Sequence, residues 1–520
     1  MKHLYRTALL IALPVALLLT GCTKDFESIN TDTNKSSADT YVPGYNLTRA
    51  QLEFTGNSDF SYETWRVNII YAGMMMQQLA NTGWYAGDKY IQNDAFASAY
   101  FDVAYRDQVK YVMDLLEITK DKPLYANLYQ VGRIVRVLIF HRITDLYGDI
   151  PYSEAGLGYY RRVFTPKYDT QSSIYADMLK ELDEAAKALD DSKDKIGTSD
   201  LVFRGATNAV TLWKKTAYSL MLRLAMRLTK VDAPTAKTWA EKAYAGGLIS
   251  SNAENAYVAH DAAGGRTTVN RNSNILSGEW NATGKGEVFL SKTFIDFLKN
   301  NNDPRLPFMA QIHSSGNTTP AQQVGMPNGY DQNGGATDIT HAANYPADVN
   351  NYSTIRSSVM LKLAAPTFLV TYAQVELLLA EAAKRGWSVG ESAAAHYKKG
   401  VTAAMTQLAQ FDAGATLSES DADNYLLAHP YADATGFQQI NTQYWVASFL
   451  DWYEVWSNWR RSDYPTLVPV NYVGNATGGK IPRRMLYPAS EASANGTNLQ
   501  QALSRQGDNV FMTRVWWDKP

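Results

Sequence analysis

Apolar residues recur every three or four positions over long parts of the chain, which is the spacing that places them on one face of a helix. Between 170 and 189 most of the charged residues fall on the opposite face, and Asp169 or Thr170 could cap the start of the helix. The pattern predicts an amphipathic helix with a buried stripe of Ile174, Met178, Leu182, Ala185 and Leu189.

Two further stretches predict pairs of helices joined by short turns. One pairs 211–230 with 236–247, and the other pairs 367–386 with 391–411. Bulky residues on the long helices and alanines where helices would cross resemble the tetratricopeptide repeat. We expect a mainly α-helical scaffold of such hairpins, although an unrelated all-α bundle has the same periodicity. The expected stripes are Trp213, Ala217, Leu220, Leu224 and Leu228 in the first pair and Leu369, Tyr372, Val375, Leu379 and Ala382 in the second.

The stretch 444–459, "YWVASFLDWYEVWSNW", predicts a long aromatic helix whose rings form a buried stripe. By contrast, the segment 248–352 is rich in Gly, Asn, Ser and Thr and has one clear helical pattern, over 291–305. Long loops of this kind are usually functional. This loop-rich segment is where we expect the binding surface.

The N-terminus carries a different apolar pattern. Lys2 and Arg6 precede an apolar run over 8–19, which has the length of a secretory signal and is too short to span a bilayer. The sequence "LTGC" that ends at Cys22 resembles a bacterial lipobox, although an ordinary signal peptide with a chance cysteine is the alternative. We expect residues 1–21 to be removed and Cys22 to carry the lipid that anchors the protein.

The remaining chain divides by composition. Residues 22–43 are polar and without periodicity, as expected of a flexible tether, and 44–520 form the expected single domain with its loop-rich insert at 248–352. The formal net charge of the full chain is −2, and loss of Lys2 and Arg6 makes it about −4. Nothing in this charge favours nucleic acid as a partner.

The common catalytic and cofactor motifs are absent from the sequence. It has seven histidines with no HExxH, and it lacks GxSxG, Walker A and GxGxxG patterns. We therefore expect no enzymatic activity, metal or cofactor, while carboxylates are frequent enough that a glycoside hydrolase stays open as an alternative.

Aromatic residues in the polar loops are the best candidates for ligand contacts. A Trp or Tyr flanked by Gly and Asn has little core to join, and its flat face suits a sugar ring while amides bond the hydroxyls. A peptide would also fit. If one surface gathers them, the predicted platform consists of Trp84, Tyr85, Trp280 and Tyr330.

Several motifs together resemble the SusD/RagB family of outer-membrane nutrient-binding lipoproteins. They are "DFESINTDTNKS" after Cys22, "HRITDLYGDIPYSEAG" from His141, "WRRSDYPTL" from Trp459, and "PRRMLYPASEASAN" with "DNVFMTRVWWDK" near the C-terminus. In the second and third, Gly148 with Pro151 and Pro465 mark turns at helix ends.

The resemblance implies a SusD-like fold and a location on the outer membrane at the cell surface. It also implies capture of an oligosaccharide or peptide and its delivery to a SusC-like TonB-dependent transporter. The family's ligand-contacting positions vary, so the motifs assign none. A helical-repeat scaffold that binds only protein partners is a further alternative.

Overall fold

The computed structural model describes residues 41–58, 62–83, 87–279 and 288–520. Contacts divide the chain into two units, Met1–Pro43 and Gly44–Pro520. Of the first unit only 41–43 are described, so the predicted lipid-bearing Cys22 lies outside the described residues. No helix among the described residues is long and apolar enough to cross a bilayer.

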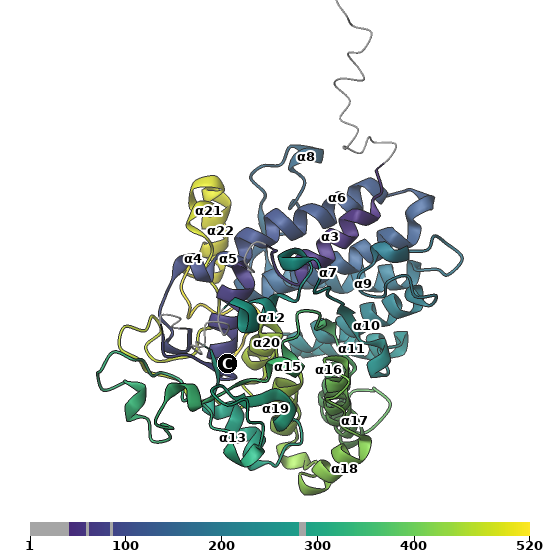
Figure 1. Cartoon of the computed structure of the whole chain (residues 1–520). Helices are drawn as coiled ribbons and strands as arrows, with labels where there is room; N and C mark the ends of the chain where they lie inside the picture. The colour runs from purple at the N-terminus through teal and green to yellow at the C-terminus, as the bar shows by residue number, and fades with distance from the viewer. Residues whose placement is uncertain (1–40, 59–61, 84–86, 280–287) are drawn as a thin grey trace, which may run out of the picture. The chain divides into compact units, whose positions relative to one another are not determined.

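The second unit is mainly helical (Figure 1). The α-helices of its first half are α3 (Gly44–Phe54), α4 (Asp94–Ala97), α5 (Ala99–Val103), α6 (Lys110–Thr119), α7 (Ala126–Tyr147), α8 (Gly158–Arg161), α9 (Gln171–Ala188), α10 (Ala209–Arg227) and α11 (Ala233–Gly246). Those of its second half are α12 (Arg271–Ser273), α13 (Lys292–Asn300), α14 (Leu306–Met309), α15 (Ser357–Met360), α16 (Tyr372–Lys384), α17 (Ala393–Thr406), α18 (Glu419–Ala428), α19 (Gly436–Ala447), α20 (Trp452–Ser462), α21 (Ala489–Ala494) and α22 (Gly496–Gln506). A π-helical segment, η1 (Thr64–Gly73), packs against α20.

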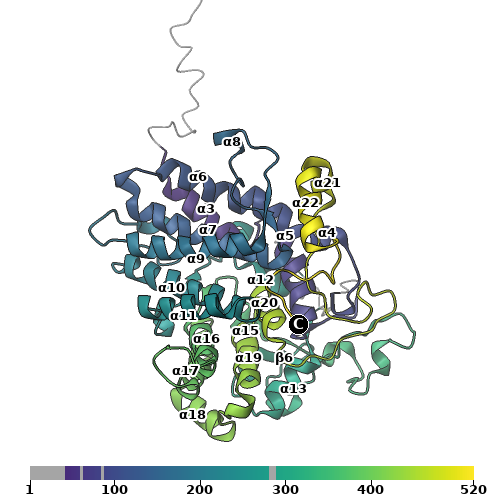
Figure 2. The ribbon, with the colours of Figure 1, turned by 180° about the vertical axis from the view of Figure 1, so that it is seen from behind.

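Successive long helices pack side by side in a row. Helix α7 packs between α6 and α9, α10 packs against α9 and α11, and α16 packs against α10, α17 and α19. Figures 1 and 2 show this row from opposite sides. The mainly α-helical class is thus confirmed, and α10–α11 and α16–α17 are the two expected hairpins.

Local sequence explains where these helices begin and what they bury. The Thr170 side chain caps α9 by accepting a hydrogen bond from the Ser173 N–H, and Thr371 and Gln374 form a capping box on α16. The whole predicted stripe of α9, from Ile174 to Leu189, is buried, as is the stripe of α10. These helices are therefore fixed by capping and by burial of one apolar face.

Two predicted helices have different boundaries in the structure. Residues 367–370 form strand β8, so Leu369 belongs to a strand and α16 begins only at Tyr372. The stretch 444–459 is divided between α19 and α20 by a break at Leu450, whose φ is 79°. The Asn68 and Asn272 side chains both donate hydrogen bonds to the Leu450 carbonyl, at 3.2 and 3.0 Å, and these contacts from distant segments stabilise the break.

A buried ion pair joins α16 to α20. Arg461 donates from Nη1 to Glu381 Oε1 at 2.6 Å and from Nη2 to Glu381 Oε2 at 2.8 Å, and neither side chain is more than 1% exposed. Burial acts to raise the pKa of Glu381, but Arg461 and Arg385 outweigh it and lower this pKa to about 2. The "WRRSDYPTL" motif therefore contributes a tertiary contact inside the scaffold.

A second buried network joins α7, α10 and α20. Arg227 on α10 donates to Asp145 on α7 at 3.1 Å and to Glu454 on α20, and its side chain is fully buried. Burial favours a higher pKa for Glu454, but Arg227 and Arg223 lower it to about 2. Asp145 belongs to the "HRITDLYGDIPYSEAG" motif, in which Gly148 ends α7 at a φ of 86° that favours glycine. Both motifs therefore hold helices together.

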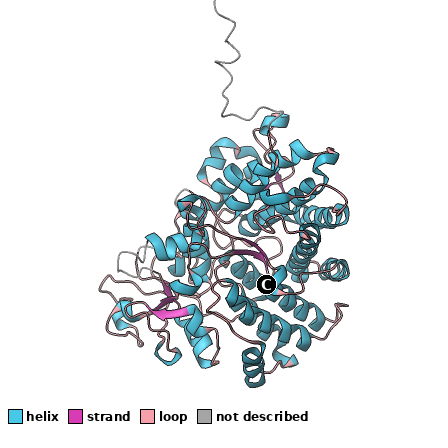
Figure 3. Cartoon of the chain, turned by 45° about the vertical axis from the view of Figure 1, so that its right-hand side comes forward, coloured by secondary structure: helices cyan, strands magenta, loops and turns pink. Residues whose placement is uncertain are grey.

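The strands are few and short (Figure 3). They form four antiparallel pairs: β1 (Leu79–Ala80) with β5 (Phe289–Leu290), β2 (Ile150–Pro151) with β3 (Tyr168–Asp169), β4 (Ala256–Val258) with β8 (Thr367–Val370), and β6 (Ala310–Ile312) with β7 (Ser353–Ile355). Three of these pairs involve the loop-rich segment 248–352. A small apolar cluster that includes Phe289, Met326 and Tyr352 lies in the same region, apart from the main core.

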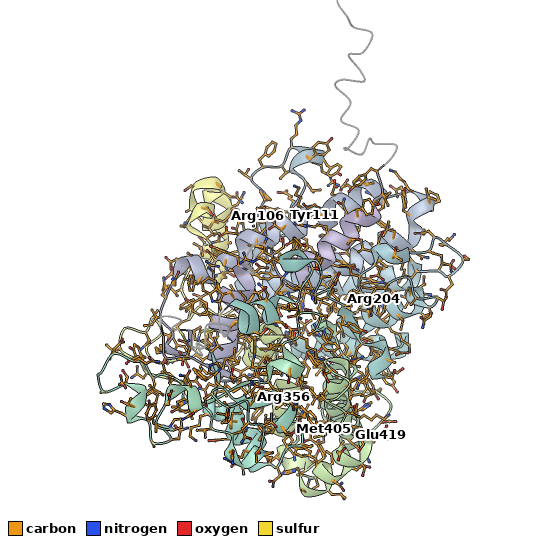
Figure 4. All side chains as sticks on the ribbon, in the orientation of Figure 1. Arg106, Tyr111, Arg204, Arg356, Met405 and Glu419 are labelled. Carbon is orange, nitrogen blue, oxygen red and sulfur yellow. The ribbon has the colours of Figure 1, made fainter. Side chains whose placement is uncertain are left out.

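Surface and interior charges differ in their surroundings. Arg106, labelled in Figure 4, pairs with Asp107 while 66% of its side chain stays exposed. The Arg461 side chain is 0% exposed. Exposed pairs of the first kind contribute little to stability, whereas breaking a buried pair is costly.

Candidate functional site

A hollow of about 410 Å³ opens at the surface of the loop-rich region. Loop residues 327–330, 336–337 and 468–472 form most of its wall, with Gln77, Lys292 and Thr293 completing it. Its aromatic members are Tyr330 and Tyr472, both half-buried. Segments far apart in the sequence therefore meet around one concave surface.

Asp331 holds two sides of this hollow together. Its Oδ2 accepts hydrogen bonds from the Tyr472 hydroxyl and the Thr337 hydroxyl, both at 2.6 Å, and its Oδ1 accepts from the Asn333 N–H at 3.0 Å. Partial burial acts to raise the pKa of Asp331, but these donors lower it below its usual value. The carboxylate also raises the pKa of Tyr472, so this phenol keeps its proton and stays fixed in the wall.

Asn328 and Gly329 attach the loop 327–330 to segments that lie far from it in the sequence. Asn328 Nδ2 donates to the Leu79 carbonyl at 2.8 Å, and its Oδ1 accepts from the Ser291 hydroxyl at 2.6 Å. The Gly329 N–H donates to Asp88 Oδ2 at 3.1 Å. Gly329 has a φ of 86°, and a Cβ there would lie 2.5 Å from Val470 Cγ1, so only glycine lets the two loops approach this closely.

The hollow also presents polar groups that are free to bind. Within the described residues, the Tyr330 hydroxyl and the Asn471 amide nitrogen donate no hydrogen bond, while Tyr330 packs partly against the small apolar cluster. Nearby, Lys89 Nζ lies 5.9 Å from the centre of the Tyr472 ring. Ring faces beside an amide and hydroxyls are suited to a polyhydroxylated ligand.

The lining offers little for catalysis. Among the described residues that line the hollow there is no Asp, Glu or His, and Asp331 behind the wall is committed to its hydrogen bonds. No group of three or more metal-ligating side chains occurs in the described part of the chain.

Of the four predicted platform residues, the structure places Tyr330 in the hollow. Trp84, Tyr85 and Trp280 lie outside the described residues. Thr82 contacts the loop that follows Tyr330, because Gln332 Nε2 donates to the Thr82 hydroxyl at 2.6 Å. In addition, Ala80 pairs with Phe289 in the β1–β5 sheet. The shared platform therefore remains a prediction.

Sequence reasoning missed Tyr472. It stands in "PVNYVGNATGG", a Tyr among Asn and Gly residues, which is the signal that singled out Tyr330. The stretch lies more than a hundred residues after the loop-rich segment, and its approach to Tyr330 depends on the Asp331 contact. The composition could have identified Tyr472 as a candidate ligand contact, but it could not have shown that Tyr472 lies beside Tyr330.

The fold agrees with comparisons to known proteins. Residues 38–488 match the SusD-like family described as "Starch-binding associating with outer membrane". A solved chitin-binding protein is 34% identical over 92% of this chain and 100% of its own, with a TM-score of 0.79. A structure named Bacteroidetes AC2a SusD-like is 27% identical over 92% of this chain and 100% of its own, with a TM-score of 0.80.

A chitin-binding SusD homologue from Flavobacterium johnsoniae shares the fold, with a TM-score of 0.73 at 24% identity over 92% of this chain and 97% of its own. No curated protein matches the chain. The chain belongs to the SusD-like family, which is described as starch-binding and associating with the outer membrane.

Proposed function

We propose that this protein captures an oligosaccharide in the hollow between Tyr330 and Tyr472. The observation that carries the proposal is this pair of half-buried tyrosines in a concave surface whose described lining has amides and hydroxyls and no acidic residue. Similar proteins described as chitin-binding and starch-binding support a glycan as the ligand. A peptide is the second ligand class that these groups could accept.

The protein acts by binding, without turnover of its ligand. Glycoside hydrolysis uses a pair of carboxyl groups roughly 5–9.5 Å apart, one of them able to donate a proton. The lowered pKa of Asp331 makes it a poor proton donor at neutral pH, and its oxygens already accept hydrogen bonds. The hydrolase alternative therefore lacks support among the described residues.

Titration with oligosaccharides tests this proposal. Purified protein is titrated with chitohexaose, maltohexaose and a peptide mixture, and the solutions are then analysed for cleavage products. We expect binding of an oligosaccharide without products, and we expect Tyr330→Ala to weaken it about five- to tenfold because one stacking face is lost.

The matched control is Tyr159→Ala on α8, where the side chain is 90% exposed and away from the hollow. This variant should bind as tightly as the wild type. Equal affinities for wild type and a folded Tyr330→Ala variant would remove Tyr330 from the site, and cleavage products would favour the hydrolase.

Delivery follows capture in this proposal. Cys22 bears a lipid anchor on the outer membrane, and residues 22–43 connect it to the binding domain, which passes its ligand to a SusC-like TonB-dependent transporter. The membership of an outer-membrane-associated family supports this arrangement. A lid on a transporter should bury about 1,200–2,000 Å² or more, so mild detergent extraction should recover both proteins together.

The anchor has its own test. Cys22→Ala removes the only thiol of the chain, so the variant should leave the membrane fraction or stay unprocessed. A variant that stays firmly bound to membranes would show that something other than the lipid holds the protein there.

A further inference from the structure

A second cleft of about 410 Å³ lies where three distant segments meet. It is lined by the start of α9, the end of α22 and the segment 514–519 near the C-terminus. None of its lining residues belongs to the hollow of Tyr330 and Tyr472. The two concave surfaces are therefore separate.

Trp516 gives this cleft an aromatic wall. Its neighbour Trp517 is fully buried and donates its indole N–H to Asp145 at 3.1 Å, whereas Trp516 is half-buried and lines the cleft. The Tyr175 ring lies 6.3 Å from the Trp516 ring, at an interplanar angle of 55°. A half-buried indole beside a polar cleft can stack against an amphipathic ring.

Hydrogen-bond donors line the same cleft as the indole. Arg505 donates from Nε to Asp149 at 3.0 Å and from Nη2 to the Tyr168 carbonyl at 3.0 Å, and Arg514 donates from Nη1 to Asp518. A guanidinium has five N–H groups, so each arginine keeps further donors for a ligand. Lys519 is exposed and forms no ion pair within the described residues. The cleft can thus donate to the oxygens of a ligand.

Two buried acceptors in the same lining have no donor. Gln171, at the first position of α9, is 0% exposed and uses its Nε2 on the Thr144 carbonyl at 2.7 Å, but its Oε1 accepts nothing from the described residues. Asp518 is 1% exposed and its Oδ2 is likewise without a partner. An unpaired buried acceptor is costly, and a hydroxyl at the base of the cleft would satisfy it.

We propose that this C-terminal cleft is a second saccharide-binding site. A sugar ring stacks on Trp516, its oxygens accept from Arg505, Arg514 and Lys519, and its hydroxyls supply donors toward Gln171 and Asp518. The excess of donors over free acceptors favours sugars that carry N-acetyl or carboxylate groups over plain glucans. The inference rests on the proposed function, because both sites take saccharides, but it concerns a different surface.

Calorimetric titration with chitohexaose tests the inference through stoichiometry. We expect two binding events per chain in the wild type and one in Trp516→Ala, with the remaining event weakened about five- to tenfold in the double variant with Tyr330→Ala. Trp239→Ala is the matched control, because Trp239 is also a half-buried tryptophan and lies on α11 outside both surfaces. It should keep both events.

Lys519→Ala is the second variant, since an exposed lysine can be replaced without disturbing the fold. It should weaken one of the two events about tenfold, and a hexauronate probe should lose more affinity than chitohexaose. One event per chain that Tyr330→Ala weakens and Trp516→Ala leaves unchanged would overturn this inference alone. No binding of any saccharide to the wild type would overturn the proposed function as well.

Discussion

The helical row and the hollow are stabilised by different contacts. In the row, Arg461 and Glu381 meet at 2.6 Å inside a large apolar core, with both side chains almost fully buried. Around the hollow, Asp331 connects surface loops through hydrogen bonds from Tyr472, Thr337 and Asn333, beside a small separate cluster. Changes in the row should therefore affect global stability, whereas changes at the hollow should affect binding with little loss of stability.

The largest effect is expected from Arg461→Leu. The change leaves the buried carboxylate of Glu381 with only Arg385 as its cation, and breaking a buried pair in this way costs about 3–5 kcal/mol. Arg106→Leu is the control, because the exposed Arg106–Asp107 pair should contribute less than about 1 kcal/mol. Urea unfolding of both variants measures the difference. Equal losses would show that the buried pair does not hold α16 to α20.

Acidification should weaken the row before pH 2 is reached. The folded-state pKa values of Glu381 and Glu454 are about 2, below the ordinary value of 4.5, so their stabilisation is present above pH 4.5 and is lost as the pH falls toward 2. Unfolding midpoints in urea between pH 7 and pH 3 should decrease steeply below about pH 4.5. Glu381→Gln should flatten this decrease, and an unchanged slope would exclude Glu381 as a contributor.

Gly329→Ala should separate binding from stability. The new Cβ would lie 2.5 Å from Val470 Cγ1 and push apart the two loops that form the hollow, so we expect saccharide affinity to fall about tenfold or more. The melting temperature should fall by only a few degrees, because the main core is not involved.

Gly334→Ala is the matched control for this change. Gly334 also has a positive φ, of 74°, but a Cβ there would contact nothing within 4 Å. Its cost is limited to about 1–2 kcal/mol of backbone strain, with affinity unchanged. If the two variants lose affinity equally, the approach of the loops at Gly329 is not what shapes the hollow.

Periodicity predicted the row well because its signal is local. The stripes run along α9 and α10 and end at Leu189 and Leu228, directly after each helix, and their burial follows from the spacing of Ile174 or Trp213 with later apolar residues. The break at Leu450 was missed because Asn68 and Asn272, which lie 382 and 178 residues earlier, supply the hydrogen bonds that stabilise it. Strand β8 was missed for the same reason, since its partner β4 is a distant segment.

The hollow could be predicted only in part. Tyr330 was identified because a tyrosine among Gly and Asn residues has little local core to join, and Tyr472 carries the same signal. Their meeting depends on Asp331 and on the close approach of Gly329 to Val470, which are tertiary contacts without periodicity. Composition therefore identifies candidate ligand contacts, while the fold decides which of them form one surface.

The most direct test of the account is a crystal structure of the protein with bound chitohexaose. We predict a sugar ring in the hollow, in contact with the Tyr330 and Tyr472 rings and within hydrogen-bond distance of Asn471. A complex in which the saccharide is well ordered elsewhere on the molecule while this hollow holds none would contradict the account.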